Sequence, residues 1–194
     1  MEERNINEQE SLEIIATMIE QTREKVIRQA GMPFLTWGYT TSVIALLIWY
    51  LIGTTGLHQW HYLWFGIPAL GWPLSIATRR TQKKGYTTYV DRSVANIWLV
   101  FGTTVILCSV MAFFVVQMPI LFLVLLLMSM GVMLTGLVIR FPVAIGFGLF
   151  GILASFAFLF IGSLHQILYF AVVFFLMMVV PGHILYHLTR MKHV

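Results

Sequence analysis

The chain has 194 residues, of which 59% are hydrophobic and only 10% are charged, and its mean hydropathy is +0.85. Soluble domains carry about 25% charged residues, and no soluble fold of this length would bury so much apolar surface in one core. The composition therefore excludes a soluble globular protein and predicts an integral membrane protein whose solvent is the bilayer.

The charged residues gather in four places: at 2–28, at 79–92, at Arg140, and at Arg190 with Lys192. Between these places lie three long stretches without any Asp, Glu, Lys or Arg: 29–78, 93–139 and 141–189. A transmembrane helix needs about 20 residues, so each stretch holds two helices and a short turn. The predicted fold is all-α: three helical hairpins that form a six-helix transmembrane domain over 31–188.

The first 30 residues are predicted to form a cytoplasmic amphipathic helix. Apolar residues recur there at alternating spacings of three and four, which is typical of one helical face: Leu12, Ile15, Ile19 and Val26. The first half of this helix is acidic, so anionic headgroups would repel it, whereas membrane-surface helices are rich in Lys and Arg. We expect the apolar stripe to bind protein, either a second copy as a short coiled coil or a cytoplasmic partner.

The break between this helix and the first span is expected at Gly31-Met32-Pro33, because glycine and proline interrupt helices. The expected spans are 33–52, 61–77, 94–114, 119–138, 142–161 and 166–186, followed by a short cytoplasmic tail, 189–194. No charged residue lies within any of these spans. Intramembrane carboxylates are the usual mark of proton relays, so proton-coupled transport is disfavoured.

The second span contains two proline turns, Gly66-Ile67-Pro68 and Gly71-Trp72-Pro73. Proline removes a backbone donor and bends a helix. A broken helix frees carbonyl groups that line substrate sites in transporters, whereas a kinked helix that only packs is the simpler interpretation. The sequence leaves both open.

The loop after the second span is strongly basic, while the three opposite turns carry no charge: Arg79, Arg80, Lys83 and Lys84. Lys and Arg accumulate in short cytoplasmic loops, so this loop and both termini are expected in the cytoplasm. The same side chains are expected to hold anionic lipid headgroups, each worth about 1 kcal/mol near the surface. A nucleic-acid partner is not expected, since topology already accounts for so short a patch.

The fifth span spells G-x-G-x-x-G over 146–151, which indicates dinucleotide binding only after a strand and at a helix start. Within an uncharged membrane span the segment neither follows a strand nor starts a helix. We interpret the segment as a helix-packing stripe of small residues at helical spacing: Ala144, Gly148, Gly151 and Ser155. No cofactor is expected.

Near the end of the last span, His183 and His187 lie one turn apart. Such a pair binds zinc when one or two further ligands join it, but it equally suits the membrane interface. The sequence does not decide between a metal site and interfacial histidines.

Several segments resemble a group of small bacterial inner-membrane proteins of uncharacterised function: 31–39, 63–68 and 88–92, with Glu10-Ser11-Leu12 upstream. The resemblance covers the first half of the chain. It implies a polytopic protein of the bacterial inner membrane, and it implies no activity or site residues.

Two functions follow as hypotheses. The first is a non-enzymatic membrane protein that acts through protein partners or self-association, with the N-terminal helix as its interaction element. The second is a small transporter or channel for an uncharged or hydrophobic solute, with the second span in its pathway. An enzyme with a cytoplasmic histidine site comes third.

The topology is tested by thiol labelling in a Cys108→Ser background. Single cysteines at Gly56, Gln117 and Ser163 should react with a membrane-impermeant reagent in intact cells, because these turns are expected outside. Cysteines at Gln82 and Thr189 should react only after the membrane is opened. Labelling at Gln82 in intact cells would reverse the predicted orientation.

Overall fold

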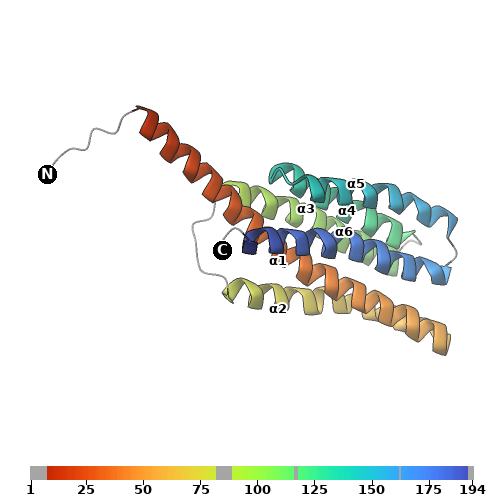
Figure 1. The fold of residues 1–194 in the computed structure, drawn as a ribbon. Helices are drawn as coiled ribbons and strands as arrows, with labels where there is room; N and C mark the ends of the chain where they lie inside the picture. The colour runs from red at the N-terminus through yellow and green to blue at the C-terminus, as the bar shows by residue number, and fades with distance from the viewer. Residues whose placement is uncertain (1–7, 82–88, 116–117, 162, 192–194) are drawn as a thin grey trace.

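The computed structural model describes residues 8–81, 89–115, 118–161 and 163–191, and this part of the chain is helical without strands. The helices run side by side as one elongated bundle (Figure 1). In chain order they are α1 (Glu8–Thr55), η1 (His58–Phe65), α2 (Gly66–Thr81), α3 (Tyr89–Phe114), α4 (Ile120–Val138), α5 (Pro142–Phe156), η2 (Ala157–Phe160) and α6 (Ser163–Met191).

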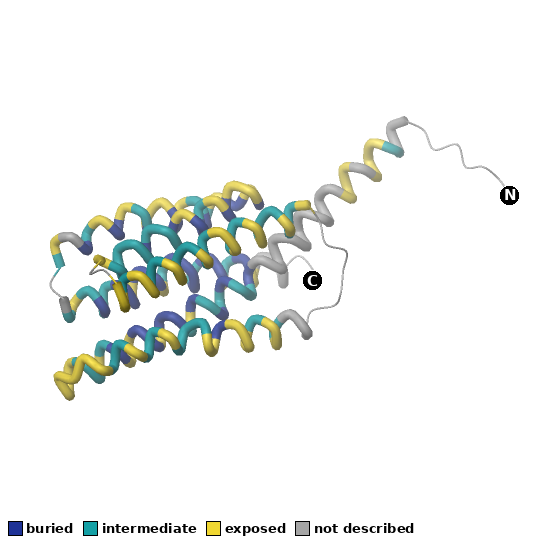
Figure 2. Tube along the Cα trace, turned by 180° about the vertical axis from the view of Figure 1, so that it is seen from behind, coloured by how far each residue is buried: buried dark blue, intermediate teal, exposed yellow. Residues whose placement is uncertain are grey.

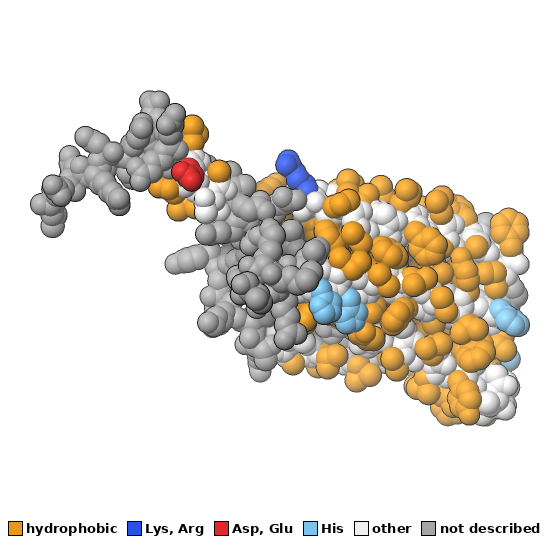
Figure 3. All heavy atoms as spheres, in the orientation of Figure 1, with side chains coloured by type: hydrophobic (Ala, Val, Ile, Leu, Met, Phe, Trp, Pro, Cys, Tyr) orange, Lys and Arg blue, Asp and Glu red, His pale blue; other side chains and the backbone are white. Residues whose placement is uncertain are grey.

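Four of these helices contain a segment long and apolar enough to cross a membrane: Gly31–Thr55, Tyr89–Phe114, Ile120–Val138 and Leu164–His187. The face of the bundle seen in Figure 3 is almost wholly apolar, and its visible Lys, Arg, Asp and Glu side chains lie toward the end from which α1 projects. The prediction of an all-helical membrane protein is therefore confirmed. Helix α5 is apolar but shorter, at 15 residues.

The expected helix break at Gly31-Met32-Pro33 is wrong, because α1 continues through Pro33 as one helix of 48 residues. Packing against α6 on both sides of the proline explains the continuity. A Cβ at Gly31 would lie 3.3 Å from the Cβ of Leu185, and one at Gly38 would lie 2.9 Å from the Cβ of Met178. Tertiary contacts thus outweigh the local cost of an internal proline. The first part of α1 extends beyond the bundle, at the end where α6 also finishes (Figure 1).

The core of the bundle lies between two tightly packed helix pairs, α1 with α6 and α4 with α5. Its largest fully buried side chains include Phe34 of α1, Phe170 and Met177 of α6, and Leu125 of α4. The buried positions follow the inward faces of these helices, whereas α3 has no buried residue (Figure 2). Two helices therefore stand at the margin of the core: α3, which packs mainly on α4, and α2, which packs mainly on α1.

Small residues set the separation of α4 and α5. All four members of the expected packing stripe, Ala144, Gly148, Gly151 and Ser155, are buried. A Cβ at Gly148 would lie 2.6 Å from the backbone nitrogen of Met133, and one at Gly151 would lie 2.8 Å from Met177 Sδ. Because the first of these neighbours is backbone, the two helices would have to separate to admit a larger side chain.

Replacement of Gly148 by leucine should lower the thermal stability of the protein in detergent, because overpacking a close contact costs about 1–3 kcal/mol or more. The matched control is Gly146→Leu in the same helix, where a Cβ would meet nothing within 4 Å. Thermal unfolding in one detergent compares the two variants. Equal melting temperatures would mean that Gly148 does not set this helix contact.

Candidate functional site

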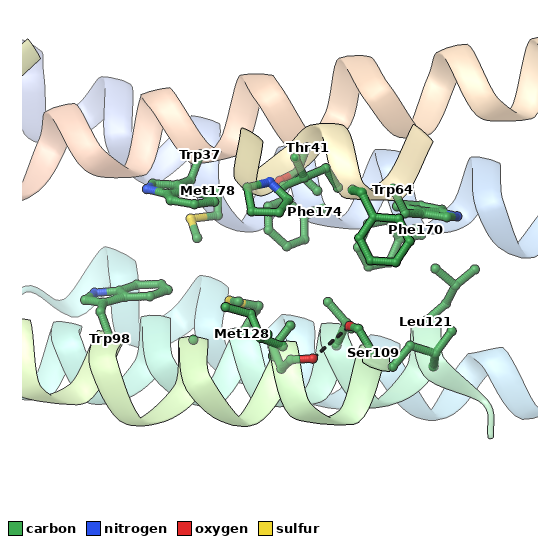
Figure 4. Close-up of a pocket in the computed structure, with 18 of the residues that line it drawn as sticks. Trp37, Thr41, Trp64, Trp98, Ser109, Leu121, Met128, Phe170, Phe174 and Met178 are labelled. Carbon is green, nitrogen blue, oxygen red and sulfur yellow. Dashed lines mark hydrogen bonds between the residues drawn. The ribbon is translucent and has the colours of Figure 1, made fainter. Parts of the chain in front are cut away.

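A large groove runs along the bundle between the two marginal helices. Helices α2 and α3 make almost no contact with each other, and the space between them continues inward to α1, α4 and α6 with a volume of about 2010 Å³. Figure 4 shows its two walls, one with Trp37, Trp64 and Phe170, the other with Trp98 and Met128. Pockets for small ligands measure about 300–1,000 Å³, so this groove has room for a long molecule.

Aromatic and methionine side chains form most of the lining. Four of the six tryptophans of the chain lie here, together with phenylalanines and methionines from α1, α3, α4 and α6: Trp37, Trp64, Trp72, Trp98, Phe34, Phe113, Phe170, Phe174, Met128 and Met178. Methionine is flexible and polarisable, so it adapts to irregular apolar shapes. Such a surface favours a hydrophobic occupant and discriminates little among closely related ones.

Aromatic contacts join the two walls. One contact joins α1 to α3: the rings of Phe34 and Trp98 meet edge to face, with centroids 5.9 Å apart. At the η1 end, Phe113 of α3 lies 5.3 Å from the ring of Tyr62 and 5.5 Å from that of Phe65. Helix α3 thus meets the other wall through these ring contacts, in which Phe34 is buried and the other rings are exposed or half-buried. The space between the contacts is left to a ligand or to lipid.

The second expected span differs from its prediction at the N-terminal end. Residues 58–65 form η1, and α2 begins at Gly66. Pro68 therefore lies in the first turn of α2, where the backbone N–H groups have no helical partner to lose, and it does not interrupt the helix. Pro68 lines the groove, whereas Pro73 lies inside α2 and is exposed.

Gly71 decides how α2 meets α1. It is buried, and a Cβ there would lie 2.8 Å from a ring carbon of Trp37. The absence of a side chain lets the Trp37 indole pass beneath α2 and reach the groove. Gly66, by contrast, has ordinary space: a Cβ there would lie 3.5 Å from Ile44 Cδ1.

Polar groups in the groove are few and neutral along its middle. Ser75 Oγ is buried without a hydrogen-bond partner, and Ser109 Oγ donates to the carbonyl of Val105 at 2.7 Å (Figure 4). Thr41 and Thr103 also contribute to the lining. These hydroxyls offer hydrogen bonds to a ligand without the cost of a charge in the membrane.

The two ends of the groove differ in chemistry. Asp91 and Arg92, at the start of α3, line one end, and Arg92 is exposed. His58 and His61 of η1 line the other, with ring centroids 6.3 Å apart.

The remaining residues singled out in the sequence lie away from the groove. His183 Nε2 is 2.7 Å from the hydroxyl of Tyr39, and His187 stacks on His183. Within the described ranges no three His, Cys, Asp or Glu side chains come together as a metal site. Leu12 is 66% exposed on the projecting part of α1.

Other parts of the expected sites fall outside what the structure describes. The side chains of Ile15, Ile19 and Val26 lie outside the described residues, as do those of Arg79 and Arg80 and the whole of Lys83 and Lys84.

The contribution of α3 is what the sequence interpretation missed. The span contains no charged residue and only a few neutral polar ones, and its groove-lining positions, such as Trp98, carry no motif. The sequence contained one signal, the glycine in the middle of this span. In the structure this residue, Gly102, lines the groove, and an added Cβ would have nothing within 4 Å.

Gly71→Ala should destabilise the protein by about 1–3 kcal/mol, because the new methyl group meets the Trp37 ring. Gly66→Ala in the same helix is the control and should be close to neutral. Trp37→Phe should recover part of the loss when combined with Gly71→Ala, which a double-mutant cycle in thermal unfolding would detect. Equal losses for the two glycine variants would remove Gly71 as the spacer.

Comparison with models of protein families, with curated proteins and with solved structures finds no match to this chain. The groove is therefore interpreted from its own shape and chemistry.

Proposed function

We propose that this protein is a non-enzymatic, six-span protein of the bacterial inner membrane that binds a hydrophobic or amphipathic molecule between α2 and α3. With such a site, the protein would move the bound molecule within or across the bilayer. The observation that carries the proposal is the groove of about 2010 Å³ along α2 and α3. Its aromatic and methionine lining and its neutral hydroxyl groups suit a ligand that partitions into lipid.

The six-span topology is part of the proposal. Four helices meet the length and apolarity of a span, and α2 and α5 would complete the six. In support, α5 continues through η2 as far as Phe160, and the Lys, Arg, Asp and Glu side chains visible in Figure 3 lie toward the end from which α1 projects. With the basic loop after α2 in the cytoplasm, both termini would be cytoplasmic as well.

A groove that opens between two helices admits a ligand from the bilayer and not only from water. Helices α2 and α3 each pack on a different neighbour and barely touch each other, so a molecule dissolved in the membrane reaches the lining by passing between them. A buried carboxylate or cation is not needed for such binding, because hydrophobic burial and dispersion supply the affinity.

Filling the groove should abolish binding. Gly102→Trp places a large ring in open space within the groove, and Gly146→Trp places the same ring in open space on α5, outside it. We expect wild-type protein, purified gently from its native membrane, to retain an apolar molecule that native mass spectrometry detects. Gly102→Trp should lose most of it and Gly146→Trp should keep it. Equal retention by the two variants would mean that the molecule binds elsewhere.

A second candidate function rests on a different observation, the exposed apolar side chains on the projecting part of α1. Leu12 is 66% exposed and Met18 is 61% exposed, at the end from which α1 extends beyond the bundle (Figure 1). An apolar helix face in water gains stability when another helix covers it. We propose that this segment binds a second copy of the chain or a cytoplasmic protein.

Two aspartates on the stripe should break this association. Ile15→Asp with Ile19→Asp should leave membrane insertion intact but lower the mass of the assembly or release a co-purifying protein. Thr17→Asp with Gln21→Asp adds the same charge one turn apart on the opposite helix face and should change neither. If both pairs leave the assembly unchanged, the segment has no such partner.

A further inference from the structure

Among the described lining residues, Asp, Glu, Lys and Arg side chains occur at one end of the groove only, where one carboxylate accompanies one cation. Arg92 lines the end formed by the start of α3 and the close of α2, and its side chain is exposed. Asp91 shares that end but is half-buried. The η1 end is lined by His58, Gln59 and His61. Among the described lining residues, Arg92 is the one Lys or Arg side chain, so it is the cation available to an anionic ligand.

The sequence around Arg92 strengthens this asymmetry. Residues 79–92 contain five basic residues and one acidic residue. The backbone of Arg79 and Arg80 belongs to the last turn of α2, next to Thr78, which lines the groove. Basic pockets between transmembrane helices on the cytoplasmic side are typical binding sites for anionic lipid headgroups.

The apolar part of the groove is long enough to hold acyl chains. Helix α3 contributes lining residues from Arg92 to Phe113, a helical rise of about 30 Å, close to the hydrocarbon thickness of a bilayer. A chain that starts at Arg92 thus runs past Trp98 and Met128 without meeting another charged side chain among the described lining residues. Flexible acyl chains fill such an irregular surface better than a rigid compact solute does.

We propose that the groove holds an anionic phospholipid of the surrounding bilayer, with its phosphate at Arg92 and its acyl chains along α3 toward Phe113. This inference rests on the proposed function and assigns its ligand class and orientation. The lipid enters sideways between α2 and α3, and the charge at one end selects anionic over zwitterionic headgroups. The alternative apolar occupant of this groove is a helix from a second copy of the chain. An apolar helix would offer no anionic group to Arg92.

The test uses the full-length protein in a mild detergent, incubated with equal amounts of phosphatidylglycerol and phosphatidylethanolamine and analysed by native mass spectrometry. Wild-type protein should bind phosphatidylglycerol preferentially. Arg92→Gln should lower that preference about fivefold, the equivalent of one Lys or Arg contact to an anionic lipid, while phosphatidylethanolamine still binds. Arg92 lies in the first turn of α3, where a cation opposes the helix dipole, so its removal does not threaten folding.

Two further variants separate the outcomes. Arg140→Gln removes another exposed cation, between α4 and α5 and outside the groove, and should leave the preference unchanged. Gly102→Trp should remove both lipids. Loss of both lipids in Gly102→Trp with an unchanged preference in Arg92→Gln overturns the headgroup assignment and leaves the groove as a binding site. Unchanged binding in Gly102→Trp, equal effects of Arg92→Gln and Arg140→Gln, no lipid on wild-type protein, or a dimer mass in place of lipid overturns the inference.

Discussion

Close approach of helix backbones at small residues is the constraint on which this structure depends. Apolar side chains gain little by leaving lipid for another helix, so association in a membrane relies on tight packing. On α1 and α6, Gly31, Gly38 and Gly182 lie against the partner helix, and on α4 and α5, Gly136 and Gly148 do the same. These contacts produce two firm helix pairs and one shared core.

The groove exists because α2 and α3 have no such close backbone contact at small residues. Gly102 of α3 faces open space, whereas Gly71, in the middle of α2, is covered by the Trp37 ring. Each helix therefore stays with its own neighbour, and α3 meets α1 and η1 through ring contacts at Phe34 and Phe113. Ring contacts of this kind hold less firmly than backbone packing, which suits a wall that has to let a membrane-dissolved molecule pass.

The unbroken course of α1 links the two candidate functions. Its projecting part carries the exposed Leu12 and Met18, and the same helix carries Phe34 and Trp37 at the groove. A continuous helix transmits a tilt or rotation along its length, since the backbone hydrogen bonds keep its residues in register. A partner that binds the projecting part would therefore act directly on one wall of the groove.

The sequence by itself determined the helical class of this protein and its apolar, membrane-suited segments, because charge cannot be hidden in lipid. It also indicated the small-residue stripe of α5 from its spacing. Only the tertiary structure decided that α1 continues through Pro33, since contacts with Leu185 and Met178 from distant sequence outweigh a local breaking signal. It also decided that Pro68 lies in the first turn of α2 and that Trp98 and Gly102 line a groove. Apolar residues that face a core, a groove or lipid look alike in sequence, and what separates them is which neighbour each helix packs against.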